Sequence, residues 1–236
     1  MAGLEKVTGS FIDGVEEASQ ILNVKGKVLP VTGHSIDLYL KLNDGSILKG
    51  ENQINHSDFE SIGVSELYVT EDMEINPHAK YSIENADYII IGPGNHYCSV
   101  LPALSIKGIK EAFYNTKAKI IYISNLTNKK GHSMHFDLSN YVKEIEKHIA
   151  KSLDIIIYNN EPPTDEQIKY YELQEGDGVI IKNDMTGDIR VREYNLLSHK
   201  INTFDKNDKV AAVRSFIRHD SNKIKNTIDS IINTQN

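Results

Sequence analysis

Short apolar runs in the middle of the chain predict a parallel β-sheet. Residues 88–91, 118–123 and 154–158 are dominated by isoleucine and tyrosine. Such brief, nearly continuous runs are typical of strands covered by helices on both faces, rather than strands with one wet face. Apolar positions 106, 109, 112 and 113 follow helical spacing between the first two runs, which predicts one right-handed strand–helix–strand unit. We expect strand 88–91 to be buried on both faces.

The N-terminal third alternates between helical and strand patterns. Ser10 is placed to cap a helix over residues 11–22, whose apolar positions are 11, 15, 18 and 22. The predicted strands are residues 27–30, 36–42, 46–51 and 62–69. Asp44-Gly45 tolerates positive φ and predicts a hairpin between the second and third of them. Residues 79–85 predict a short helix.

The rest of the chain continues the same mixture. Asp137 or Ser139 is placed to begin a helix through Ile149, and Thr164 to begin another after two prolines. The remaining predicted strands are residues 179–183, 189–194 and 210–217. A final helix has apolar positions 224, 228, 231 and 232. Since we find no repeat or linker, we expect residues 1–236 to form a single α/β domain, a mainly parallel sheet with helices on both faces and a small β-hairpin excursion.

Composition narrows the class of protein. The 236 residues are 39% hydrophobic and 25% charged, ordinary values for a globular protein, and the net charge of −7 argues against a nucleic-acid binder. Cys98 is the one cysteine, so no intrachain disulfide forms, which fits a reducing cytoplasm. No stretch approaches the length of a membrane span, and the first residues lack a signal-peptide pattern. We expect a cytoplasmic protein.

Two loops at one edge of the predicted sheet are candidates for binding. Gly92-Pro93-Gly94 ends the strand at 88–91, followed by Asn95, His96 and Ser99. The second loop, after the strand at 118–123, contains Asn125, Thr127, Lys129, Lys130 and Gly131. Ligands of open α/β sheets bind at the carboxyl ends of strands, and this position favours phosphate or sugar contacts. The alternative is an ordinary strand-to-helix turn and a solvated loop.

Arg218 follows the predicted strand at 210–217 and precedes the last helix. Its planar guanidinium suits bidentate phosphate recognition, although an Arg218–Asp220 pair that holds the terminal helix explains the spacing equally well. Ser221 or Asp220 is placed to cap that helix. Ser221 is also a candidate phosphorylation site, since the start of a helix favours negative charge.

Catalytic chemistry has little support in the sequence. The nine histidines show no metal-ligand spacing, because His132 and His135 lack a third partner. Cys98 lies in a ligand-facing loop without a recognisable base. We therefore expect neither a metal nor a cofactor, and assign no catalytic residue.

Several segments along the chain share one pattern. They are residues 8–11, 22–30, 44–51 and 86–94, Tyr97, Ser99, Pro102, Asn125, Gly131 and residues 218–220. Taken together, they resemble one bacterial family, the gluconeogenesis factors, which are relatives of 2-phospho-L-lactate transferase (CofD-like). The resemblance implies a cytoplasmic Rossmann-like protein that binds a UDP-sugar, typically UDP-N-acetylglucosamine. Such proteins support growth and cell shape on gluconeogenic carbon sources, whereas the transferase relatives join a phospholactyl group to a deazaflavin.

The chain departs from the family pattern in two places. The family opens with a strand and a Gly-Gly-Gly-Thr-Gly turn, and this chain resembles only the C-terminal two-thirds, so we expect half of a phosphate cradle and an exposed sheet edge. A homo-oligomer or another partner chain would cover that edge. In the second loop, an acidic residue of the family pattern has become His132.

The leading hypothesis is a non-catalytic protein that binds a nucleotide sugar and acts as a regulator. Its expected ligand contacts are Gly92, Pro93, Gly94, Asn95, His96, Ser99, Asn125, Thr127, Gly131 and Arg218. The alternatives are a transferase of the phospholactate type and a degenerate paralogue that no longer binds the ligand.

Overall fold

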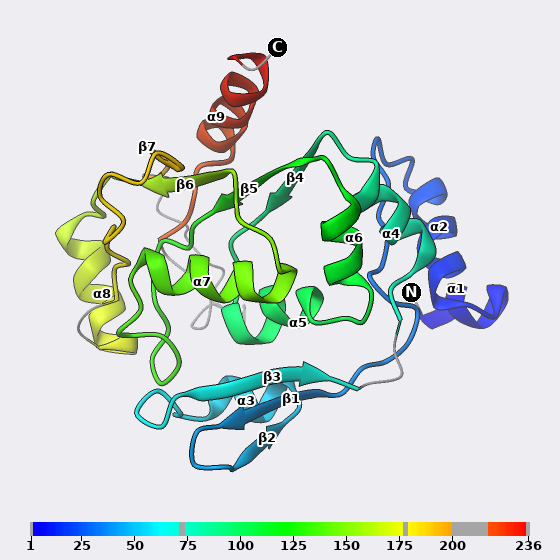
Figure 1. Ribbon diagram of the computed structural model, residues 1–236, viewed down its shortest axis with the longest axis horizontal. Helices are drawn as coiled ribbons and strands as arrows, with labels where there is room; N and C mark the ends of the chain where they lie inside the picture. The colour runs from blue at the N-terminus through cyan, green and yellow to red at the C-terminus, as the bar shows by residue number, and fades with distance from the viewer. Residues whose placement is uncertain (1, 71–73, 177–178, 200–216, 235–236) are drawn as a thin grey trace.

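Two β-sheets organise the chain (Figure 1). The computed structural model describes residues 2–70, 74–176, 179–199 and 217–234. Parallel strands lie in the order β4 (Tyr88–Ile91), β5 (Lys119–Ile123), β6 (Ile155–Asn159) and β7 (Val191–Tyr194). The smaller sheet is antiparallel, in the order β2 (Ile47–Lys49), β1 (Leu38–Leu42) and β3 (Val64–Val69). The α/β class is confirmed, and the predicted hairpin gains β3 as a third strand.

Helices fill the space between the two sheets and cover the opposite face of the parallel sheet (Figure 1). In chain order they are α1 (Ala2–Thr8), α2 (Phe11–Ile21), α3 (Glu51–His56), α4 (Pro77–Glu84), a π-helical turn η1 (His96–Val100), α5 (Leu101–Leu104), α6 (Ile109–Asn115), α7 (Leu138–Ile149), α8 (Asp165–Glu175) and α9 (Ser221–Thr234). Figure 1 shows α5, α6 and α7 between the two sheets, and α9 on the opposite side of the parallel sheet.

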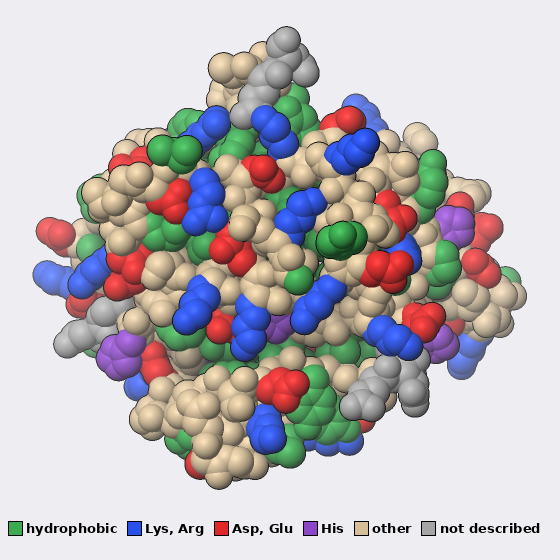
Figure 2. All heavy atoms as spheres, viewed as in Figure 1, with side chains coloured by type: hydrophobic (Ala, Val, Ile, Leu, Met, Phe, Trp, Pro, Cys, Tyr) green, Lys and Arg blue, Asp and Glu red, His purple; other side chains and the backbone are tan. Residues whose placement is uncertain are grey.

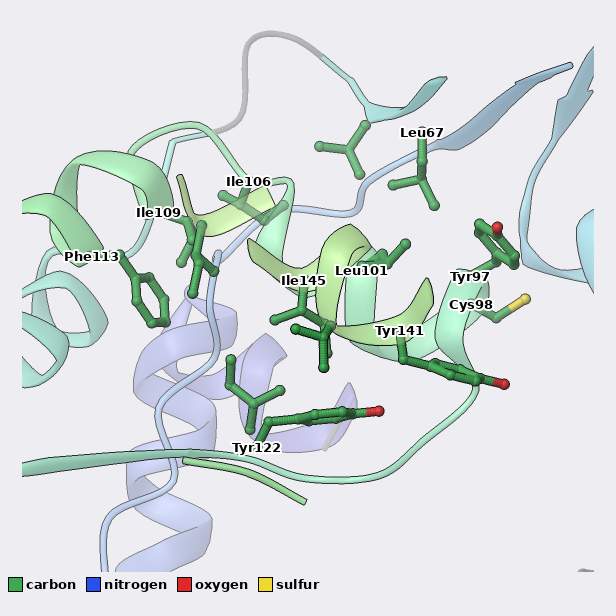
Figure 3. Close-up of a cluster of buried hydrophobic side chains, with 14 of the residues drawn as sticks. Leu67, Tyr97, Cys98, Leu101, Ile106, Ile109, Phe113, Tyr122, Tyr141 and Ile145 are labelled. Carbon is green, nitrogen blue, oxygen red and sulfur yellow. The ribbon is translucent and has the colours of Figure 1, made fainter. Parts of the chain in front are cut away.

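Alternation along the central strands divides the core into two faces. On β5, Ile120 and Tyr122 belong to the large cluster shared with α5, α6, α7 and the small sheet, part of which Figure 3 shows. Ile121 and Ile123 belong to a second cluster, which includes Ile231 of α9. Because successive strand side chains point to opposite faces, a continuous apolar run requires cover on both. The prediction of helices on both faces is confirmed.

The prediction that residues 88–91 are buried on both faces is wrong. β4 is an edge strand among the described residues, paired only with β5. Ile91 is buried, but Ile90 is 42% exposed. Ile90 pairs with Ile121 of β5 and lies on the same face of the sheet as that residue. The apolar run therefore does form a strand, but α9 covers only part of the face on which Ile90 lies.

Two further predicted strands are absent as regular strands. Residues 27–30 and 179–183 contain no ladder, although Ile180 makes an isolated bridge with Thr127. Val179 and Ile181 are buried, and their segment hydrogen-bonds to the loop after β5 instead, since Asn128 N donates to Val179 O at 2.6 Å. The apolar run there reflects burial rather than regular strand pairing.

The boundaries of other predictions shift. The strand expected at 46–51 ends at Lys49, because Glu51 begins α3. The turn before it is confirmed, with Gly45 at φ 88° and Ser46 N donating to Asp44 Oδ1 at 2.9 Å. α1 was not predicted. The strand expected at 210–217 lies, apart from Ile217, outside the described residues.

Candidate functional site

A large open cavity lies at the carboxyl ends of β4 and β5, with a volume of about 930 Å³. Its walls come from the end of α3, the loop and π-turn after β4, the loop after β5, α7, α8 and the segment before α9. This is the position at which open parallel sheets bind ligands. The volume is in the upper part of the range for small-molecule and cofactor sites.

The two predicted loops are tied together through Asn125. Its Nδ2 donates to Gly94 O at 2.8 Å, and Gly94 N approaches its Oδ1 at 3.4 Å. The Asn125 side-chain amide is therefore already hydrogen-bonded to Gly94, and it aligns both loops along one wall of the cavity. Neither Gly92 nor Gly94 has a positive φ. A Cβ on Gly94 would lie 3.2 Å from Val100 Cγ2, so close packing against the π-turn is one reason for glycine there.

Asn95 shapes the next part of the wall. Its Oδ1 accepts from Cys98 N at 3.2 Å, which caps the π-turn, and its Nδ2 donates to Asn55 Oδ1 at 3.0 Å. Lys129 Nζ donates to Asn55 O at 3.0 Å and also contacts Asn55 Oδ1. Asn55, from α3, thus joins both loops. Burial lowers the pKa of Lys129 from its usual value, and this lysine brings a positive charge to the cavity lining.

A buried polar cluster holds the loop after β5. Tyr141 of α7 places its hydroxyl 2.8 Å from Asn128 Oδ1 and 3.0 Å from Ser133 Oγ. Asn128 Nδ2 donates to Phe136 O at 3.0 Å. Since these three polar side chains satisfy each other, the loop has a defined shape rather than that of a solvated surface loop.

Three histidines line the cavity in an aromatic setting. His96 packs edge-on against Tyr141, with ring centroids 4.8 Å apart, and His132 lies 4.5 Å from Phe59. Burial lowers the pKa of His96 to about 3, and of His132 and His219 to about 4; His148 and Lys129 add to the shifts of His96 and His132 respectively. All three rings are uncharged at neutral pH. Ring nitrogens of all three are buried without a hydrogen-bond partner.

The structure brings most of the predicted contacts to the cavity. The residues that line it are Pro93, Gly94, Asn95, His96, Asn125, Thr127 and Arg218. Gly92, Ser99 and Gly131 are not in the lining. Gly131 has φ 73°, its carbonyl accepts from Phe59 N at 2.9 Å, and a Cβ would lie 3.0 Å from Asp58 Cα. Glycine is required there for packing against the segment after α3.

Sequence reasoning missed several lining residues. They are Asn55, His56, Tyr97, Tyr141, Tyr171, Glu175 and His219, along with Leu126, Asn128, His132 and Ile217. Asn55 follows the predicted strand at 46–51 and Tyr141 reads as a helix core position, so neither carries a local signal. His219 is adjacent to Arg218 and was open to inference from that neighbour.

Cys98 is not a reactive thiol in this arrangement. Its side chain is buried, and burial raises the pKa of the thiol to about 11, so it is protonated at neutral pH. Within the described ranges, no group of three or more His, Cys, Asp or Glu side chains is arranged to hold a metal ion. Among the helices that the structure describes, none is long and apolar enough to cross a membrane.

Comparison with known proteins places the chain in a family. Residues 1–201 match the family described as 2-phospho-L-lactate transferase CofD. This chain belongs to the CofD family. A gluconeogenesis factor from Bacillus subtilis is 30% identical over 234 residues, which cover 98% of this chain and 69% of the relative. One from Halalkalibacterium halodurans is 33% identical over 183 residues, covering 77% and 56% respectively.

Two solved structures share the fold of this chain. A Bacillus halodurans protein superposes with a TM-score of 0.82 at 27% identity, over 96% of this chain and 69% of that protein. A second structure of the same protein, described as a member of the UPF0052 family, gives a TM-score of 0.81 at 28% identity over 96% and 70%. The resemblance to gluconeogenesis factors seen in the sequence is thereby confirmed.

Proposed function

We propose that this CofD-family chain binds a nucleotide sugar, UDP-N-acetylglucosamine, in the cavity at the carboxyl ends of β4 and β5, and acts as a cytoplasmic regulator of growth and cell shape on gluconeogenic carbon. The observation that carries the proposal is the cavity itself. Its 930 Å³ suit a ligand of that size, and Lys129 and Arg218 bring positive charge to its lining. Its relatives' names, gluconeogenesis factor, support the regulatory role.

The family description also favours a second candidate, transfer of a phospholactate-type group. Among the described lining residues Glu175 is the one carboxylate, and its Oε2 accepts from Lys130 N at 2.8 Å. The loop backbone thus fixes its position, and the described lining offers no second carboxylate to act with it. We therefore place binding first. Release of free nucleotide from a nucleotide-activated phospholactate donor by the purified chain would reverse that order.

Isothermal titration with UDP-N-acetylglucosamine tests the binding proposal. We expect the wild type to bind, and Arg218→Ala and Lys129→Ala each to lose about tenfold or more in affinity, since charge-assisted hydrogen bonds contribute about 1.5–3 kcal/mol. Lys130→Ala is the matched control, because the exposed Lys130 side chain is outside the lining while its backbone N–H still reaches Glu175.

Thermal unfolding of each variant separates lost contacts from lost folding. Absence of heat with the wild type at millimolar ligand contradicts the proposal and favours a degenerate, non-binding paralogue. In cells lacking a gluconeogenesis factor, the wild type should restore growth on a gluconeogenic carbon source and Arg218→Ala should not.

A further inference from the structure

A second groove, separate from the cavity described above, lies between the small sheet and the helix layer. Its volume is about 350 Å³, and it is bordered by β3, the end of α5, the start of α6 and the end of α7. It shares no lining residue with the cavity at β4 and β5. We propose that this groove is an anion site that binds a phosphorylated small molecule.

Positive charge gathers in the groove although the whole chain carries −7. Lys107, Lys110 and Lys147 line it from α7 and from the segment that begins α6. Figure 2 shows a row of blue side chains above the small sheet, with histidine behind it. Lys107 Nζ lies 3.0 Å from Glu74 Oε1. Lys110 and Lys147 are exposed and form no ion pair with any residue the structure describes.

His148 lies at the back of the groove, where the lysine charges affect the pKa of its ring. Its side chain is buried, and its Nδ1 donates to Glu144 O at 2.7 Å. Burial lowers the pKa of His148, and the charges of Lys147 and Lys110 lower it further, while Glu144 opposes the shift. Both lysines therefore act on one buried ring from two different helices. Concentrated positive charge on a partly enclosed surface attracts an anion.

The other polar side chains of the lining are already engaged within the protein. Thr70 Oγ1 accepts from Asp37 N at 3.0 Å, Ser105 Oγ donates to Leu101 O at 2.8 Å, and the Tyr68 ring stacks on Tyr39. The ammonium groups of Lys110 and Lys147 are therefore the donors that a ligand would meet. Glu66 is the one carboxylate in the described lining, and it is exposed at the edge. Because Glu74 already pairs with Lys107, Lys110 and Lys147 against Glu66 leave a net positive charge that attracts a phosphate group. The volume fits a phosphate monoester of a sugar rather than a polymer.

The test uses His148 as a reporter. The pKa of its ring is measured by NMR in the full chain, alone and with glucose 6-phosphate, inorganic phosphate or glucose. Because a bound anion offsets the lysine charges, the first two probes should raise the pKa of His148, and uncharged glucose should not. An unchanged pKa at millimolar glucose 6-phosphate, or an equal response to glucose, overturns the proposal.

Variants locate the binding. The double variant Lys110→Gln, Lys147→Gln should bind glucose 6-phosphate at least tenfold more weakly, as judged from the same titration. Lys143→Gln is the matched control, since Lys143 is exposed on α7 outside the groove. All three lysines are exposed, so folding should be unaffected. Equal weakening by Lys143→Gln would show general surface attraction and overturn the assignment to the groove.

Discussion

At the scale of residues, the candidate cavity depends on groups that are costly to bury. Ring nitrogens of His96, His132 and His219, and the hydroxyl of Ser124, are buried without a hydrogen-bond partner. Such groups cost about 1–3 kcal/mol each when they leave water unpaired. Three of these four residues line the cavity, so the cost is concentrated at the candidate site.

The three histidines predict how stability depends on pH. Their folded-state pKa values are about 3 to 4, against a usual value of 6.5. Below pH 6.5 these histidines bind protons in the unfolded chain but stay uncharged in the folded chain. The free energy of unfolding therefore falls as the pH drops from 6.5 toward 4. Each ring contributes a slope of up to about 1.4 kcal/mol per pH unit. Urea unfolding between pH 8 and 5 measures it.

Replacement of one ring checks the source of the slope. His132→Phe keeps an aromatic ring against Phe59 and should make the decline with pH shallower by up to about 1.4 kcal/mol per unit. His78→Gln, at an exposed histidine of α4, is the control. Equal slopes for His132→Phe and the wild type would contradict the burial of an uncharged His132.

At the scale of elements, capping shows how the last helix is fixed beside the cavity. Asp220 Oδ1 accepts from Asn222 N at 2.9 Å and from Lys223 N at 3.1 Å, so Asp220, not Ser221, caps α9. Asp220 N also donates to Leu196 O at 2.8 Å. These bonds hold the start of α9 against the segment after β7, directly after Arg218 and His219 of the cavity wall.

Removal of this cap should destabilise α9. We expect Asp220→Ala to lower the free energy of unfolding by about 0.5–2 kcal/mol, since two backbone N–H groups lose their acceptor. Ser221→Ala, one position later, should change it by less than about 0.5 kcal/mol. Chemical denaturation of both variants measures the difference. A larger loss for Ser221→Ala would return the capping role to Ser221.

Helix starts were predictable because their signals are local. Ser10 accepts from Asp13 N at 3.3 Å, and Asp137 and Thr164 begin α7 and α8 with reciprocal capping boxes, as their positions before apolar spacing predicted. The false strands at 27–30 and 179–183 were not distinguishable, because a short apolar run does not show which backbone groups pair. The π-turn at His96–Val100 likewise depends on Asn95 and its distant partner Asn55.

At the scale of the whole molecule, the open edge at β4 is the main unpaired feature of the parallel sheet. β4 pairs with β5 on one side, and no other described strand pairs with it. Ile90 leaves 42% of its surface exposed there. An apolar edge strand is a template for pairing with another chain. We propose that two copies of this chain associate through the β4 edge.

Sedimentation velocity over a wide concentration range tests this association. The wild type should self-associate, and Ile90→Lys should shift it to monomer, because a charge on an edge strand opposes strand pairing. Ile189→Lys is the matched control, since Ile189 is 94% exposed and lies outside the β4 edge. A wild type that remains monomeric throughout, or an equal effect of Ile189→Lys, contradicts the role of this edge.

The sequence by itself determined the parallel strands, the order of the loops at their carboxyl ends and the family, because apolar runs, caps and glycine turns act over a few residues. Only the tertiary structure decided which loop residues face the cavity. The Asn125 amide hydrogen-bonds to Gly94, and Gly131 packs against Asp58. Asn55 and Tyr141 line the cavity from α3 and α7. Those contacts join positions from 8 to 74 residues apart, and no local pattern encodes them.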